Sequence, residues 1–370
     1  MDWMLVRMLR AWRVTIVVFH KGLSPFFIGL FFLLFRALMS LGLALDNLIF
    51  PTLRKVDVLA PIVIVGNPRT GTTFLHRFLV DQRLGAGTEL WRMIAPSITW
   101  QILIKPFLSK LEGISPSRHH GAAAHRTGLQ YVETEDCSTF FRFFDGPFVY
   151  GFFLSWDEQD WRQMFDLKTR NTSSRDFQWF RSIWSRNLLI TRQKRVVAKA
   201  FSLSLRLPEF FEEFPDARVI YVVRDPVTFV PSALSLITGV LEDKYGFWCQ
   251  PENLREVFIG RTYISLLALS QTFCDHWAKG LIPREKVLIV TYDLMMSDFE
   301  AVAGEIFSFV GQDVSPQLIE ETHLVSEQQQ KWHSGHYYRA EDFGLTPEKI
   351  RDDYAFLYET FGLTHECSWI

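Results

Sequence analysis

The chain has 370 residues, of which 48% are hydrophobic and 22% charged, which is enough apolar material for a sizeable buried core. Its 39 basic and 41 acidic residues give a net charge of −2, which argues against a broad nucleic-acid-binding surface. The four cysteines lie far apart and form no C-x-x-C pair. This spacing argues against a zinc site or a disulfide framework and suits a reducing compartment such as the cytoplasm.

The first 55 residues form a hydrophobic and basic leader. Three arginines within residues 7–13 alternate with apolar residues, the pattern of an amphipathic helix on anionic lipid. Residues 23–45 contain one charge, Arg36, and approach the roughly 20 residues that a membrane-spanning helix needs. We expect a membrane-associating segment over residues 1–55. A surface anchor, a true span and a helical cap on the following domain all stay open.

The most distinctive feature of the chain is the run over residues 62–79, which predicts a buried strand, a tight loop and an amphipathic helix. Gly66 and Gly71 would let the loop turn sharply, so that its N–H groups and the helix N-terminus face one anion, such as a nucleotide phosphate. Thr72 stands where an ATP- or GTP-binding P-loop carries lysine, and the cation of this loop is Arg69. This favours a nucleotide whose transferable group is not a γ-phosphate.

From Pro61 onward, short apolar runs alternate with amphipathic helices. The pattern predicts strands over residues 62–65, 196–199, 218–223 and 287–291, and helices over residues 72–81, 205–214, 227–237 and 299–310. The fold class is therefore α/β, a P-loop-like parallel sheet flanked by helices, with an N-terminal hydrophobic helical segment. We expect one catalytic domain over residues 56–370, with 85–195 as a mainly helical acceptor-side insertion. The aromatic run over residues 140–161 suits either helical core or an apolar acceptor pocket.

A second candidate ligand contact follows another predicted strand. Arg224 comes directly after the apolar run 218–223, and doubly wound sheets bind ligands at the carboxyl ends of their strands. A guanidinium suits a phosphate because it donates two aligned hydrogen bonds. The structural alternative is a salt bridge between Arg224 and Asp225.

These segments resemble the sulfotransferase family, whose 5′-phosphosulfate loop has the pattern P-[KR]-[ST]-G-[ST]-[ST]. The resemblance covers residues 61–362, densely at the two nucleotide motifs and thinly between 90 and 195. It implies the donor 3′-phosphoadenosine 5′-phosphosulfate (PAPS), an acceptor hydroxyl or amine, and no metal. Here we expect an apolar or lipid-like acceptor at a membrane surface. The implied loop contacts to the donor are Pro68, Arg69, Thr70, Gly71, Thr72 and Thr73.

The resemblance also implies contacts to the 3′-phosphate. The family uses an arginine and a serine eight residues later, which here are Arg224 and Ser232. A similar closing loop near the end of the chain implies Lys331, His333 and Ser334 as further nucleotide contacts.

The same resemblance assigns catalytic roles. Arg69 would stabilise charge on the departing bridge oxygen, as in phosphoryl transfer. The family branch with arginine in the loop often takes its base from a glutamate after the first helix, which implies Glu89; pairing with a neighbouring arginine is the alternative. Lys199 matches a family lysine near the sulfonate. However, Ala200 and Phe201 depart from the family pattern after it, so a solvated strand-end lysine stays possible.

Other bases and other functions stay open. Rival bases are His119, His120, His125, Glu133, Glu135 and Asp136. Such a cluster could hold a metal by ligand type, but its histidines do not have the i, i+4 spacing. A P-loop kinase or NTPase would need a lysine after Gly71 or a Walker-B-like acid. A non-catalytic nucleotide-binding membrane protein would be expected to have a damaged second motif.

Overall fold

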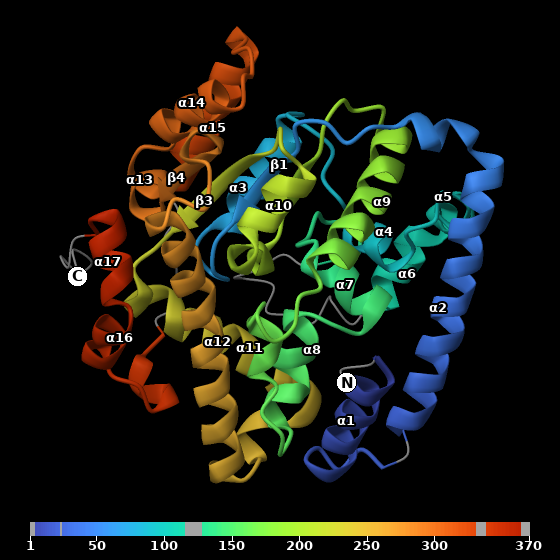
Figure 1. Cartoon of the computed structure of the whole chain (residues 1–370), viewed down its shortest axis with the longest axis vertical. Coiled ribbons are helices and arrows are strands. Elements are labelled where there is room, and N and C mark those ends of the chain that lie inside the picture. Colours follow the sequence, from blue (N-terminus) through green and yellow to red (C-terminus); the bar gives the residue numbers. More distant parts are fainter. Residues whose placement is uncertain (1–3, 23, 115–127, 331–337, 364–370) are drawn as a thin grey trace.

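The structure is a computed structural model, and it describes residues 4–22, 24–114, 128–330 and 338–363 (Figure 1). At its centre is a four-stranded sheet in the order β2-β1-β3-β4, in which every neighbouring pair is parallel. The strands are β1 (Ile62–Val65), β2 (Val197–Lys199), β3 (Arg218–Val223) and β4 (Val287–Thr291). The predicted parallel sheet is therefore confirmed, with each strand within one residue of its expected bounds.

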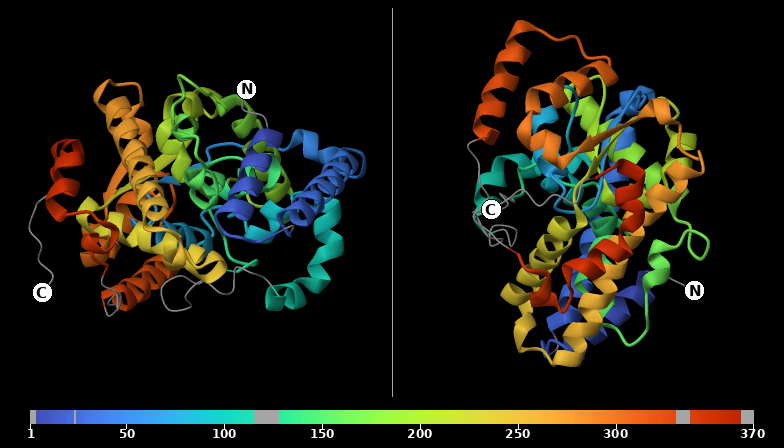
Figure 2. Two further views of the ribbon diagram at one scale, coloured as in Figure 1. Left: turned by 90° about the horizontal axis from the view of Figure 1, so that it is seen from below. Right: turned by 90° about the vertical axis from the view of Figure 1, so that its left-hand side faces the viewer.

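Helices cover both faces of the sheet (Figures 1 and 2). Alternate residues of β1 explain why: Ile62 and Ile64 enter one hydrophobic cluster, whereas Val63 and Val65 enter the other. The first face packs against α3 (Thr72–Asp81), α13 (Tyr292–Ser297), α14 (Phe299–Phe309) and α15 (Pro316–Gln330). The second packs against α9 (Ser173–Thr191), α10 (Leu207–Glu213), α11 (Pro226–Tyr245), α12 (Glu252–Ala278), α16 (Pro347–Asp353) and α17 (Ala355–Phe361).

The segment between α3 and β2 is mainly helical in its described parts. Its helices are α4 (Leu90–Ile94), α5 (Ile98–Ile104), α6 (Leu108–Ile114), α7 (Asp136–Phe143) and α8 (Pro147–Phe152), followed by α9. The aromatic run contributes both to the wall of a cavity and to a hydrophobic core cluster. Phe140 and Phe148 line a cavity, whereas Leu154 and Trp161 are buried in a core cluster.

The N-terminal segment forms α1 (Met4–Val17) and α2 (Ser24–Ile49), and α2 runs along one side of the molecule (Figure 1). Of the arginines in the first helix, Arg7 does not follow the pattern of a helix with its basic side on lipid. Arg7 is buried, donates a hydrogen bond to the backbone oxygen of Phe144 (2.8 Å) and lies 3.5 Å from Asp145. Arg13 pairs with Glu158 at 2.5 Å. These arginines therefore face acidic and carbonyl groups of the domain.

Candidate functional site

The loop between β1 and α3 has the backbone that a tight anion-binding turn requires. Gly66 has a φ of +146°, and a Cβ atom there would lie 2.5 Å from the backbone oxygen of Val222 on the neighbouring strand. Gly71, which precedes the first residue of α3, has a φ of +91°. Side chains are disfavoured at both positions, so glycine is required. The N-terminus of α3 follows directly and directs its free N–H groups into the loop.

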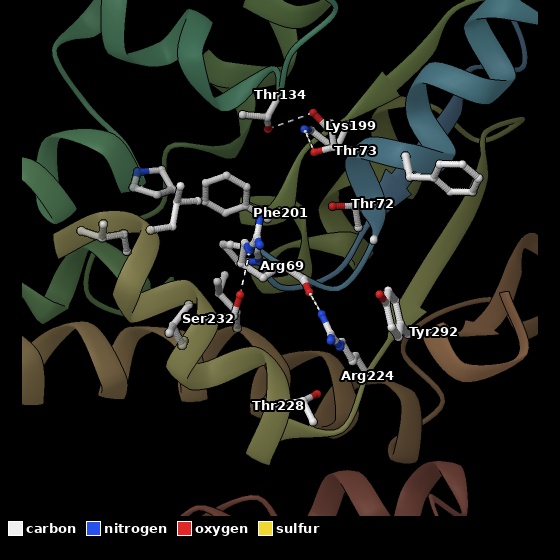
Figure 3. Close-up of a pocket in the computed structure, with 18 of the residues that line it drawn as sticks. Arg69, Thr72, Thr73, Thr134, Lys199, Phe201, Arg224, Thr228, Ser232 and Tyr292 are labelled. Atoms are coloured by element: carbon white, nitrogen blue, oxygen red, sulfur yellow. Dashed lines mark hydrogen bonds between the residues drawn. The ribbon is translucent and has the colours of Figure 1, made fainter. Parts of the chain in front are cut away.

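The two predicted nucleotide motifs meet at this loop (Figure 3). The Nε atom of Arg69 donates to Ser232 Oγ at 2.9 Å, and Arg224 Nη1 donates to the backbone oxygen of Arg69 at 2.8 Å. The guanidinium of Arg224 also lies 3.9 Å from the ring centre of Tyr292, which follows β4. In the order β2-β1-β3-β4, this meeting point lies between β1 and β3, where the strand order reverses and where such sheets bind ligands.

The alternative partner of Arg224 is engaged elsewhere. Asp225 caps α11 by accepting a hydrogen bond from the backbone N–H of Val227 (3.0 Å), and the hydroxyl of Tyr358 donates to the same carboxylate (2.6 Å). Arg224 is therefore left to face the loop and Tyr292.

Lys199 contacts the same loop from the end of β2. It is buried, and its Nζ atom donates to Thr73 Oγ1 at 2.8 Å, which excludes the solvated alternative. Burial lowers the pKa of Lys199 and also that of Arg224. An anion bound among Lys199, Arg69 and Arg224 would offset the cost of burying these positive charges.

These cations line one cavity of about 1300 Å³. Pro68, Gly71 and Thr72 of the loop line it too, together with Ser232. Four helices, α7, α8, α11 and α12, add an apolar part of the wall, through residues that include Phe140, Phe141, Phe148, Phe152, Leu236, Ile237, Val240, Leu266 and Leu269. Charged and polar residues also line the cavity, among them Asp81, Asp293, Gln328 and Arg339. The cavity therefore combines a cationic region at the loop with apolar wall from these four helices.

Thr70 has its side chain directed into the loop. Its side chain is buried inside the loop, where its hydroxyl donates to the backbone oxygen of Asn67 at 2.8 Å. The described residues that line the cavity include its neighbours on both sides. Thr70 therefore shapes the loop, and its hydroxyl is used within the loop itself.

The carboxylates predicted as bases lie in different surroundings. Glu89 Oε2 accepts hydrogen bonds from Trp91 Nε1 and Arg92 Nε, both at 2.7 Å, so it makes the arginine pairing foreseen as the alternative. The described residues that line the cavity include Leu90 and Glu133 but not Glu89.

Glu133 is held in the cationic region of the cavity. Its Oε2 atom lies 3.8 Å from Lys199 Nζ, and its Oε1 atom lies 3.7 Å from Arg77 Nη2. The Oε1 atom is buried and accepts no hydrogen bond from the residues that the structure describes. Glu133 is therefore a carboxylate that lines the cavity and lies within ion-pair distance of both Lys199 and Arg77.

The other two acids, Glu135 and Asp136, are buried in the protein core. Asp136 accepts hydrogen bonds from Thr134 Oγ1 and from the backbone N–H of Phe201. Glu135 is fully buried, and burial raises the pKa of its carboxyl to about 7.

Several predicted residues fall outside the described ranges. They are His119, His120, His125, Lys331, His333 and Ser334. Among the described residues, histidine, cysteine, aspartate and glutamate form no group of three that could hold a metal ion.

Sequence reasoning assigned no role to Tyr292 or Arg77, although both line the cavity. The rule that singled out Arg224 also applies to Tyr292, because Tyr292 directly follows a parallel strand. The sequence contained a weaker indication for Arg77. This residue lies one turn after Thr73 on the helix that begins at the loop.

Comparison with known proteins defines the class to which this fold and site belong. A family model described as "Sulfotransferase family" matches residues 61–316, and the chain belongs to this family. Two curated relatives are named Omega-hydroxy-beta-dihydromenaquinone-9 sulfotransferase Stf3, one from Mycobacterium bovis and one from Mycobacterium tuberculosis. Each is 27% identical over 183 residues, or 48% of this chain and 45% of the relative. The chain thus matches less than half of their length.

Two solved structures share the fold over most of the chain. Sulfotransferase STF9 from Mycobacterium avium has a TM-score of 0.68 at 17% identity and covers 87% of this chain and 82% of its own. Sulfotransferase STF1 from Mycobacterium tuberculosis H37Rv has a TM-score of 0.66 at 19% identity and covers 95% and 91%, respectively.

Proposed function

We propose that the chain transfers a sulfonate group from PAPS to a hydroxyl or amine of an apolar or lipid-like acceptor. The observation that carries this proposal is the contact of Arg69 with Ser232 and Arg224, which joins the two nucleotide motifs into one site. Membership of the sulfotransferase family supports the same reaction.

In this proposal the loop N–H groups and the hydroxyls of Thr72 and Thr73 hold the 5′-phosphosulfate, while Arg224 and Ser232 hold the 3′-phosphate. The acceptor oxygen or nitrogen attacks sulfur in line, the sulfur bond to the bridging oxygen breaks, and adenosine 3′,5′-bisphosphate leaves. Arg69 and Lys199 stabilise the charge that develops on the bridging oxygen. The acceptor proton passes to a carboxylate.

The apolar part of the cavity wall supports a lipid-like acceptor. Its phenylalanine, leucine and isoleucine side chains would bury a hydrocarbon chain, while the cationic region holds the reacting group. The names of the two mycobacterial relatives describe sulfonation of a menaquinone, which is consistent with an acceptor of this kind.

A labelled-transfer assay tests this function. The full chain is incubated with PAPS that carries a radiolabelled sulfonate and with a lipid extract, and we expect label in an organic-soluble product. Arg69→Ala should reduce the rate by about 10²- to 10³-fold, because it removes charge stabilisation at the bridging oxygen. Transfer from γ-labelled ATP in place of PAPS would contradict the proposal.

The contacts favour Glu133 over Glu89 as the base, because Glu133 lines the cavity beside Lys199 whereas Glu89 is bound by Trp91 and Arg92. We expect Glu133→Gln to lower kcat by about 10²- to 10⁴-fold without weakening the binding of adenosine 3′,5′-bisphosphate. Glu89→Gln is the matched control and should stay within a few-fold of the parent. If Glu89→Gln lowered kcat more than Glu133→Gln does, Glu89 would be the base instead.

We also propose that the catalytic domain works at the cytoplasmic side of a membrane. The helix α2 is long and apolar enough to cross a membrane, and 17% of its most apolar stretch is buried in the domain, so most of that stretch is exposed. The helix α12 passes the same test but is 56% buried and belongs to the core. The described cysteines Cys137, Cys249 and Cys274 are free thiols, which suits a reducing compartment.

A further inference from the structure

The apolar side of helix α2 faces outward, and its ionisable residues face the domain. This is the reverse of a helix that is exposed to water. Every exposed residue between Phe26 and Ala44 is apolar, with Phe31 68% and Leu34 63% exposed. Its ionisable residues lie on the other side: Asp46 is fully buried and Arg36 is half-buried. A helix that faced water would show polar residues on its outer side. The outer face of α2 therefore suits an apolar medium.

The inner face of α2 is fixed to the domain at both ends. Near its start, a Cβ atom on Gly29 would lie 1.9 Å from the ring of Trp12 in α1. Near its end, a Cβ atom on Gly42 would lie 2.2 Å from the ring of Trp100 in α5. These glycines allow close contact along the helix, so α2 is part of the wall of the domain.

Asp46 fixes the last turn of α2. Its carboxylate accepts hydrogen bonds from Arg186 Nε (2.8 Å), Ser97 Oγ (2.9 Å) and the backbone N–H of Thr99 (2.9 Å). All of this carboxylate and nearly all of the Arg186 side chain are buried. The helix cannot leave the domain without exposing this ion pair.

Exposed basic residues lie in the chain before and after α2, and the exposed Asp57 lies among the residues that follow it. Lys21 precedes α2, and Arg54 and Lys55 follow it. Beside α2, the neighbouring α5 and the turn after it expose Ile102, Leu103, Phe107 and Lys105. An apolar surface flanked by cations matches the surface of an anionic membrane.

We propose that α2 lies in the plane of an anionic membrane, with its outer face in one leaflet, and does not span the bilayer. This inference rests on the proposed membrane association and adds its geometry. With 26 residues, α2 is about 39 Å long, enough to span. Spanning, however, would draw the attached domain and its charged surface into the hydrocarbon. The in-plane position immerses only the apolar face, to a depth of about 5–10 Å.

Membrane depth at two positions of α2 tests this geometry. Nitroxide labels are placed by Phe31→Cys and Leu48→Cys in the full chain with Cys249→Ser and Cys367→Ser, bound to phosphatidylcholine–phosphatidylglycerol vesicles. We expect similar shallow depths at both positions. A difference approaching about 25 Å, the rise over the intervening helix, would show a span and overturn the proposal. Water-accessible labels at both positions would also overturn it.

Two controls separate immersion from misfolding. A label at Leu324→Cys on α15, where the leucine is 50% exposed, should stay in water. The variant Phe31→Ser/Leu34→Ser should bind vesicles at least about tenfold more weakly and melt like the parent, whereas Leu324→Ser should bind as the parent does. Unchanged vesicle binding by Phe31→Ser/Leu34→Ser would contradict the proposal, whether or not the chain transfers sulfonate.

Discussion

Glu135 connects burial with the pH dependence of stability. Burial raises the pKa of this carboxyl from 4.5 to about 7, so between these values the folded chain binds more protons than the unfolded chain. The free energy of unfolding should therefore fall as the pH rises through this window. We expect Glu135→Gln to match the parent below pH 4.5 and to exceed its stability by up to about 3 kcal/mol above pH 7. Urea unfolding measures both; a pH-independent difference would contradict this expectation.

Individual site residues were predictable where they belong to a local motif or end a strand. Arg69 and Arg224 follow β1 and β3, and parallel strands bring their carboxyl ends to one edge of the sheet. The proposed choice of Glu133 over Glu89 as the base was not predictable, because it rests on contacts between distant segments. Thr134 Oγ1 donates to the backbone oxygen of Lys199 at 3.1 Å, and this contact holds Glu133 beside the cavity. The spacing of residues along the sequence does not indicate that Thr134 and Lys199 are in contact.

The position of α2 depends on a buried charge, the carboxylate of Asp46. Asp46→Ala would leave Arg186 buried without its carboxylate, and we expect a loss of about 3–5 kcal/mol in the free energy of unfolding. The exposed Asp57→Ala is the control and should change stability by less than about 0.5 kcal/mol. Denaturant unfolding compares the two. A loss below about 1 kcal/mol for Asp46→Ala would mean that the pair does not hold the helix.

The apolar character of α2 could be predicted from the sequence, but the orientation of α1 could not. The alternation of arginine with apolar residues is the same for a helix on lipid and for a helix on an acidic protein surface. The partners of Arg7 and Arg13 are Asp145 and Glu158, which come from the distant insertion. Only the tertiary fold decides between these two surroundings.

At the scale of the whole molecule, the sheet was predictable because each strand is a short apolar run followed by a helix. The ends of helices were less predictable. The helix α11 was expected to end at residue 237, but it continues to Tyr245 and ends at Gly246, which has a φ of +63°. The cavity as a whole was not predictable, because its wall combines helices that are far apart in the sequence, among them α3, α7, α11 and α12. Its shape depends on how these helices pack, which periodicity does not encode.

We propose that the loop, Arg224 and Ser232 form one site for a nucleotide with a 3′-phosphate and a 5′-phosphosulfate. The most direct measurement is the melting temperature of the full chain with adenosine 3′,5′-bisphosphate and with ATP. We predict stabilisation by the bisphosphate, about 2.7 kcal/mol at a concentration of about 100 times its Kd, and a smaller shift for Ser232→Ala. Stabilisation by ATP without any by the bisphosphate would contradict the claim.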